Sequence, residues 1–319
     1  MTKVAGHLLA RAWVLGIGHF LVIASLAIGH SSAAAPTTTH ALIPPPMPRR
    51  VIAPTTNAPQ GESVLLEDGG VKFTLFIPSG WKASDSGETI VTTHFHTIVW
   101  FVIQEHLRRG VATALICFQL GEGSTTYRQP FEDTNRFSRV LRLVEGELSK
   151  RSAPVHVQIR GVDISSFSAG YGAVRELVKS PSYFKMIRRI VLLDSMYAAF
   201  EPTAAVERPR KPANDQIEVW APFAQAALRG EKTFVLTHSA VPTDKYASSG
   251  ECATALLELL EVPRELVRSG TLPATTDREF PLQSRADRGK FHIWAYGGED
   301  AQAHMTHVRH MADVWRALD

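Results

Sequence analysis

The sequence predicts an α/β fold, in which helices cover both faces of a mainly parallel central sheet and a hairpin opens the domain. Short apolar and β-branched runs alternate with segments of helical periodicity over most of the chain. This alternation is typical of a parallel sheet covered on both faces. The turn sequence Asp68-Gly69-Gly70 lies between two strand-like runs and indicates the N-terminal hairpin.

The predicted elements follow one another closely along the chain. Strands are expected from their apolar or β-branched runs at 63–67, 71–77, 89–94, 113–120, 155–166, 189–193, 233–237 and 291–296. Helices are expected from apolar residues three or four apart at 100–107, 131–148, 170–178, 219–228, 251–260 and 305–318. The segment 122–128 is expected as a loop. Chemistry in sheets of this kind gathers at the carboxyl ends of the strands, so candidate residues are sought there.

Composition and charge fit a globular protein with a sizeable core. Of the 319 residues, 45% are hydrophobic and 20% are charged. The formal net charge is +3, but Lys3 and Arg11 lie in the N-terminal segment, which leaves 32 positive and 31 negative residues in the remainder. This near-neutral balance gives no electrostatic footprint for nucleic acid.

The N-terminal segment, residues 1–35, has the features of a secretory signal peptide. Its two basic residues precede an apolar run over 12–28, and small residues follow at 31–35. A retained membrane anchor is the alternative, because the run is close to the shortest length that spans a bilayer. The chain is therefore expected to be secreted or periplasmic, with no stable membrane span after cleavage.

The rest of the chain divides into a linker and one domain. Residues 36–61 are rich in Pro, Thr and Ala and predict an extended linker. Residues 62–319 are expected to form the α/β domain, with a small lid near 198–216. The cysteines, Cys117 and Cys252, are too few for a disulfide scaffold, and free thiols are preferred over a bridge between them.

Ser168 lies where a strand is expected to turn into a helix. The strand leads into the pentapeptide at 166–170, Ser-Phe-Ser-Ala-Gly, and the helix follows. This is the setting of a G-x-S-x-G nucleophile elbow, with Ser166 in place of the first glycine. Small flanking residues are required because the nucleophile is held in strained backbone geometry close to its neighbours. The sequence therefore predicts Ser168 as a nucleophile at a helix N-terminus.

Four stretches that include this motif resemble the α/β-hydrolase superfamily: 92–100, 164–174, 191–197 and 304–318. More narrowly, they are similar to exported bacterial serine hydrolases of the esterase type, in which an H-x-H segment follows the third strand. The resemblance extends from about residue 62 to the C-terminus. It implies the α/β-hydrolase fold, a triad in the chain order Ser, acid, His, no cofactor, and a small-molecule ester as the substrate.

A serine hydroxyl needs a general base, and the base needs an acid to orient it. The resemblance implies His304 as the base, because it follows the last strand and a glycine-rich loop, just before the final helix. The second and third choices are His307 and His310, which lie on that helix.

The acid is expected at Asp194, directly after the strand at 189–193 and therefore at the same edge of the sheet as Ser168. Some α/β-hydrolases take the acid from this strand. The commoner position, after the next strand, corresponds to Asp244, which stays the alternative. Glu251 is a more remote candidate.

Two backbone N–H groups are expected to form an oxyanion hole. One belongs to Ala169, directly after the nucleophile, and the other to Thr97 or its neighbour Ile98. The superfamily often has His-Gly in the loop after the third strand, and here Thr97 stands where that glycine would be.

Two other functions compete with the preferred one. A metal-dependent hydrolase would use a cluster of histidines as zinc ligands, namely His94, His96, His304, His307 and His310. No carboxylate accompanies the H-x-H pair at metallohydrolase spacing, however, so no metal is expected. A non-catalytic exported binding protein on the same fold is favoured by the departures at Ser166 and Thr97. The preferred function is an exported serine hydrolase that cleaves a carboxylic ester, or less readily an amide, through an acyl-enzyme on Ser168.

Overall fold

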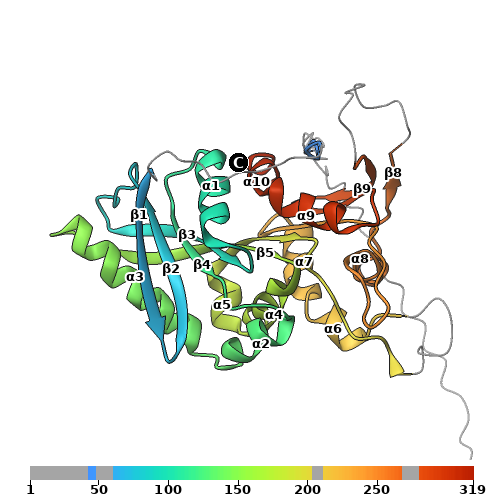
Figure 1. The fold of residues 1–319 in the computed structure, drawn as a ribbon, viewed down its shortest axis with the longest axis horizontal. Coiled ribbons are helices and arrows are strands. Elements are labelled where there is room, and N and C mark those ends of the chain that lie inside the picture. Colours follow the sequence, from blue (N-terminus) through green and yellow to red (C-terminus); the bar gives the residue numbers. More distant parts are fainter. Residues whose placement is uncertain (1–41, 48–59, 203–210, 268–279) are drawn as a thin grey trace, which may run out of the picture. The chain divides into compact units, whose positions relative to one another are not determined.

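A computed structural model describes residues 42–47, 60–202, 211–267 and 280–319 of the protein (Figure 1). These residues belong to one compact unit, 40–319. The predicted signal peptide at 1–35, most of the predicted linker and the middle of the predicted lid lie outside the described residues. Among the helices described, none has the length and apolar character needed to cross a membrane.

Within the described ranges, the strands form one sheet of ten, in the order β1-β2-β4-β3-β5-β6-β7-β10-β9-β8. Six neighbouring strands, from β4 to β10 in that order, run parallel. Antiparallel strands complete the sheet on both sides. The strands are β1 (Gly61–Asp68), β2 (Val71–Pro78), β3 (Glu88–Phe95), β4 (Ala114–Phe118), β5 (Gln158–Phe167), β6 (Ile187–Leu193), β7 (Thr233–His238), β8 (Glu265–Leu266), β9 (Leu282–Arg288) and β10 (Phe291–Tyr296).

The predicted N-terminal hairpin is confirmed. β1 and β2 pair antiparallel, with Asp68 opposite Val71 and two glycines between them. Gly69 and Gly70 have φ angles of 52° and 83°, which a two-residue hairpin turn requires and which glycine adopts without a steric penalty.

Helices cover both faces of the sheet, as predicted (Figure 1). One face is covered by α1 (Val99–Arg109), α9 (Ala301–Arg309) and α10 (Met311–Arg316). The other is covered by α2 (Ser124–Glu132), α3 (Arg136–Ser152), α4 (Tyr171–Lys179), α5 (Pro181–Met186), α6 (Asn214–Glu218), α7 (Ala221–Leu228) and α8 (Ser249–Leu259).

Each central strand contributes side chains to two cores in alternation. In β4, Ile116 and Phe118 are buried under one layer of helices, while Leu115 and Cys117 are buried under the other. This alternation follows from the two-residue period of a strand, and it explains why the sequence of a central strand is apolar throughout. Cys117 and Cys252 are buried free thiols in different cores.

The structure differs from the predicted elements in several places, among them the short helices α5 and α6, which were not predicted. Residues 124–132, predicted in part as a loop, form α2, whose sequence contains Pro130 and little apolar periodicity. The final helix is divided into α9 and α10 at His310. The strands β8 and β9 were not predicted, because β9 is a polar strand near the edge of the sheet, with the sequence LQSRADR.

A short described segment ahead of the domain lies against the last strand. Met47 is only 2% exposed and forms an isolated bridge with Phe280. The Tyr296 hydroxyl donates to the carbonyl oxygen of Pro45 at 2.7 Å. Part of the segment predicted as a linker therefore has fixed contacts with the domain.

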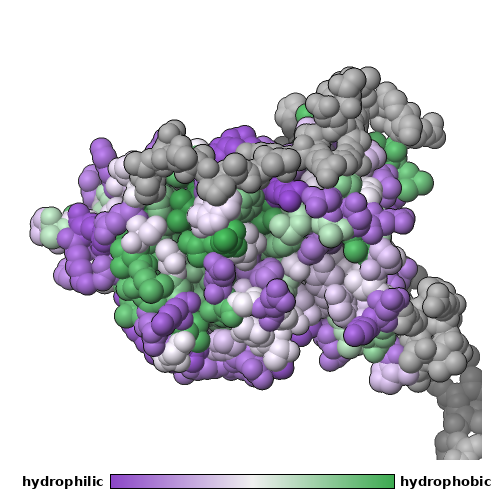
Figure 2. Space-filling view, viewed as in Figure 1, coloured by the Kyte–Doolittle hydropathy of each residue, from purple (hydrophilic) through white to green (hydrophobic). Residues whose placement is uncertain are grey.

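Surface hydropathy also varies over the fold (Figure 2). Apolar side chains gather over the hairpin of β1 and β2, where Leu65 is 68% exposed. Single exposed apolar residues such as Leu65 are normal on a protein surface. The hairpin forms one end of the sheet and is separated from β5 by β4 and β3.

Candidate active site

Ser168 lies in a sharp turn between β5 and α4. Its φ angle is 46°, a left-handed conformation that costs a non-glycine residue energy and that occurs often at functional sites. A single turn of 3-10 helix, η1 (Ser168–Gly170), leads into α4. A Cβ atom at Gly170 would collide with the carbonyl oxygen of Phe95 on β3, so only glycine permits this close approach. The turn has the geometry of a nucleophile elbow.

Asp194 occupies the equivalent position on the neighbouring strand. Phe167 is paired with Leu193, so Ser168 and Asp194 each follow the last paired residue of their strand. Asp194 also has a left-handed φ angle, 44°. Its backbone is held by hydrogen bonds from its own N–H to Thr237 O, 2.7 Å, and from the Tyr197 hydroxyl to its carbonyl oxygen, 3.0 Å.

His304 is the imidazole that contacts Asp194. Its Nδ1 lies 2.8 Å from Asp194 Oδ2, and its ring stacks on that of Phe167 with 4.5 Å between centroids. An ionised carboxylate only accepts, so Nδ1 carries the proton of this hydrogen bond. His304 lies within the first turn of α9, which Asp300 caps by accepting from the N–H of Ala303 at 2.8 Å. The prediction that His304 precedes the helix is therefore wrong by one helical turn.

The carboxylate of Asp194 is buried, with 3% of its side chain exposed, yet it is held in the ionised form. Burial alone would raise its pKa. The hydrogen bond with His304, the electrostatic attraction of that imidazole and the Ser239 hydroxyl outweigh burial and hold the pKa of Asp194 well below its usual range. Ser239 donates to Oδ2 at 2.6 Å, the same oxygen that His304 contacts.

Ser168 and His304 are connected through the ring of Phe167 and are not hydrogen-bonded to each other. Phe167, whose ring His304 covers, directly precedes Ser168. In the described part of the chain, no hydrogen bond joins Ser168 Oγ to His304 Nε2. Such contacts are often long in free enzymes and shorten when a substrate binds.

The alternative residues have other partners. His307 is buried and its Nδ1 is 2.8 Å from Thr237 Oγ1, while His310 Nδ1 is 2.7 Å from Asp313 Oδ2. Glu251 accepts from the backbone N–H of Ser248 at 2.7 Å as part of a capping box on α8. Asp244 is exposed in the loop after β7. None of these four contacts the imidazole of His304 in the described hydrogen bonds.

The segment after β3 carries further backbone strain. His96 and Thr97 have φ angles of 67° and 133°, although both have side chains that disfavour such values. Thr97 and Ala169 are both half-buried, and their backbone N–H groups belong to the turns that follow β3 and β5 at this edge of the sheet.

The predicted alternative of a histidine metal cluster is not favoured by the contacts. The His94 imidazole is hydrogen-bonded to Ser165 Oγ and His96 O, and that of His96 to Tyr127 Oη at 3.0 Å. Within the described ranges there is no group of three or more His, Cys, Asp or Glu side chains placed to hold a metal ion.

Sequence reasoning missed three residues that support the site. Ser239, Ser195 and Tyr197 all follow directly or closely on strands β6 and β7, at the edge where Asp194 lies. Their position at the carboxyl ends of parallel strands was a signal that could have identified them.

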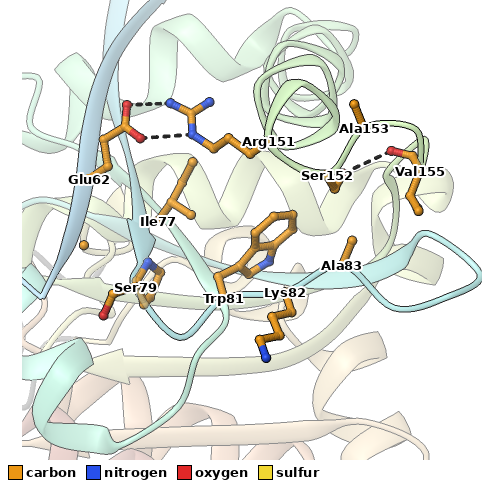
Figure 3. A pocket seen from close by; sticks show the side chains of 12 residues that line it. Glu62, Ile77, Ser79, Trp81, Lys82, Ala83, Arg151, Ser152, Ala153 and Val155 are labelled. Carbon is orange, nitrogen blue, oxygen red and sulfur yellow. Dashed lines mark hydrogen bonds and ion pairs between the residues drawn. The ribbon is translucent and has the colours of Figure 1, made fainter.

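A hollow of about 730 Å³ lies at the opposite edge of the sheet (Figure 3). Trp81 and Lys82 line it beside an ion pair between Arg151 Nη2 and Glu62 Oε1, 2.6 Å apart. Its walls come from the start of β1, the end of β2 and the segments that precede β3 and β5. No histidine is present among the described residues that line it, so it lacks a general base for a serine.

The strand order and the elbow between β5 and α4 define the α/β-hydrolase fold. No protein-family model matches the chain, and a search of curated proteins found no similar sequence. Similar solved structures include the feruloyl esterase module of Clostridium thermocellum, at 11% identity over 86% of this chain and 95% of that chain, with a TM-score of 0.47. The S-formylglutathione hydrolase of Agrobacterium tumefaciens is similar at 13% identity over 82% of this chain and 97% of that chain, with a TM-score of 0.42.

An uncharacterised protein from Capnocytophaga ochracea is similar at 10% identity, with a TM-score of 0.46; the match covers 81% of this chain and 64% of that chain. At such low sequence identity, the similarity to these structures concerns only the overall arrangement of the helices and strands. The assignment of the fold therefore rests on the strand order and the elbow of this chain.

Proposed function

We propose that the protein is a serine hydrolase that cleaves a small-molecule carboxylic ester through an acyl-enzyme. The observation that carries the proposal is the contact between His304 and the buried, ionised Asp194, beside a serine in strained elbow geometry. A nucleophile, a base and an orienting acid on neighbouring turns are the components that this chemistry needs.

In the proposed reaction, His304 Nε2 takes the proton of Ser168 as Oγ bonds to the ester carbonyl carbon. The N–H groups of Ala169 and Thr97 hold the resulting oxyanion. The bond to the alcohol oxygen then breaks, and the alcohol leaves with the proton from His304. His304 then takes a proton from water as the water oxygen bonds to the acyl carbon. The bond to Ser168 Oγ breaks, Oγ regains the proton from His304, and the carboxylic acid leaves. Asp194 keeps the proton of the imidazole on Nδ1 throughout.

The proposal is tested with a fluorophosphonate probe, which reacts with activated serines. The wild-type protein should become labelled, and Ser168→Ala should not, at equal folded concentration. Ser79→Ala, which removes a hydroxyl at the opposite edge of the sheet, serves as the matched control and should be labelled like wild type. Absence of labelling in a folded wild type would favour the non-catalytic binding protein, and loss of ester hydrolysis on chelation would favour a metal enzyme.

We also propose that the protein is exported, on the strength of the sequence of residues 1–35. Expression of the full chain followed by N-terminal sequencing should give a mature protein that begins near residues 34–36, recovered outside the cytoplasm. A protein that keeps Met1 and stays with the membrane fraction would instead support an anchor.

A further inference from the structure

Two buried serines, Ser165 and Ser166, directly precede the elbow in β5 and are 1% and 0% exposed. Successive residues of a strand point to opposite faces, so their hydroxyls have different partners. Each hydroxyl begins a short chain of hydrogen bonds, and the two chains end at different turns of the proposed active site. The inference drawn from them rests on the proposed function.

The first chain runs from Ser166 through Ser195 to the elbow. The Ser195 hydroxyl donates to the carbonyl oxygen of Ser168 at 2.8 Å, and Ser166 Oγ lies 2.8 Å from Ser195 Oγ. A carbonyl oxygen only accepts, so the single proton of Ser195 is directed to Ser168. Ser166 must therefore donate to Ser195. The serine that replaces the first glycine of the elbow is thus the start of a directed chain.

The second chain runs from Ser165 through His94 to the loop after β3. His94 Nε2 lies 2.7 Å from the carbonyl oxygen of His96, and Nδ1 lies 2.8 Å from Ser165 Oγ. Since the carbonyl only accepts, Nε2 carries the proton. Burial lowers the pKa of His94 to about 3, so the ring is neutral and Nδ1 accepts from the hydroxyl of Ser165.

Each chain of hydrogen bonds ends on the carbonyl oxygen of a peptide group whose N–H is a proposed oxyanion donor. The carbonyl of Ser168 and the N–H of Ala169 belong to one peptide, and the carbonyl of His96 and the N–H of Thr97 to another. A trans peptide is planar, with its C=O and N–H pointing in opposite directions. Fixing the carbonyl therefore fixes the direction of the N–H. These two N–H groups are the proposed oxyanion donors.

We propose that Ser165 and Ser166 are positioning residues for the oxyanion hole, acting through His94 and Ser195 to orient the peptides His96–Thr97 and Ser168–Ala169. Donors held in place before the reaction need no rearrangement as the oxyanion forms. The left-handed φ angles of His96, Thr97 and Ser168 require such external support, because they are unfavourable on their own.

The decisive variant is Ser195→Ala, which removes the hydrogen bond to the carbonyl of Ser168. With p-nitrophenyl acetate, kcat should fall about 10- to 100-fold, less than the loss of a whole oxyanion donor, while KM stays within about twofold. The inhibition constant of a trifluoromethyl ketone, whose adduct with serine carries an oxyanion, should rise by the same factor. Ser165→Ala, one bond farther from its peptide, should lower kcat about 3- to 10-fold with the same pattern. Ser195→Cys, of similar size and a weaker donor, replaces Ser195→Ala if that variant does not fold.

The matched control is Thr93→Val. Thr93 is 0% exposed in β3 beside His94, and its hydroxyl has no partner among the described residues, so kcat and inhibition should equal those of wild type. A folded Ser195 variant with unchanged kcat and unchanged inhibition would overturn the inference, as would a change in KM alone. A wild type that neither hydrolyses esters nor reacts with fluorophosphonate would instead overturn the proposed function itself, and the inference with it.

Discussion

The two edges of the parallel sheet differ in how their backbone turns are made. At the carboxyl edge, four turn residues with left-handed φ angles have side chains: His96, Thr97, Ser168 and Asp194. At the amino edge, the turn before β3 uses Gly87, which adopts its φ angle of 74° without a penalty. The hollow of about 730 Å³ lies at this amino edge. A larger hollow, of about 880 Å³, lies at the carboxyl edge, where His238, Ser239 and Tyr296 line it. The strained turns and the larger hollow are therefore at the same edge.

The largest expected effect comes from the acid. In Asp194→Asn, the amide would favour the wrong tautomer of His304, and kcat should fall by about 10⁴-fold. The comparison variant at the amino edge is Glu62→Gln, which breaks the partly exposed pair with Arg151. It should leave kcat unchanged and have little effect on the free energy of unfolding, because exposed ion pairs contribute little to stability. Steady-state kinetics and urea denaturation measure both; equal kinetic losses in the two variants would contradict the assignment of the site to the carboxyl edge.

At both edges of the sheet a glycine lies close to a neighbouring backbone. Alanine variants of these two glycines distinguish a loss of stability from a loss of activity. A Cβ at Gly170 would collide with Phe95 O, and a Cβ at Gly87 with His156 O. Both alanine variants should lose about 1–3 kcal/mol of unfolding free energy through overpacking. Only Gly170→Ala should also lose activity per folded molecule, because its collision displaces the elbow. Active-site titration with fluorophosphonate gives the folded, reactive fraction, and full activity per folded Gly170→Ala molecule would show that the elbow tolerates the shift.

The last expected effect is a slope of stability with pH. Burial lowers the pKa of His94 to about 3, and those of His106 and His307 to about 4. Below pH 6.5 the unfolded chain binds protons at these residues that the folded chain does not, so stability falls as the pH decreases. Each contributes at most about 1.4 kcal/mol per pH unit until its folded pKa is reached.

Urea denaturation between pH 6.5 and 5 measures this slope above the range in which most carboxylates titrate. His106→Gln should reduce the slope by the contribution of one residue while leaving the carboxyl edge intact. A free energy of unfolding that does not change over this interval would contradict the neutral, buried state of the three histidines.

The sequence predicted the elements and residues that local signals specify. Ser168 was found from a strand, a small-residue turn and a helix in succession, and Asp194 from an acidic residue directly after an apolar strand. His304 Nδ1 lies 2.8 Å from Asp194 Oδ2, and the catalytic role of both residues is a proposal.

The remaining features depend on pairing between distant segments. Ser195 contacts Ser166 only because β5 and β6 pair with Phe167 opposite Leu193, and no local pattern determines that register. Ser239 likewise meets Asp194 through the alignment of β6 with β7. In β9 the small buried residues Ser284 and Ala286 alternate with more exposed polar ones, but the strand contains no β-branched or aromatic residue that would identify it from the sequence. Its place in the sheet is set by its partner β10.

The contact between Tyr296 and Pro45 has a consequence for the order in which the chain acquires its structure. The two residues are 251 positions apart, so the segment at 42–47 is synthesised long before the strand that holds it. Its ordering must wait until β10 has joined the sheet. This segment is thus among the last parts of the domain to be fixed, and its protection from proteolysis would report that the whole sheet has been completed.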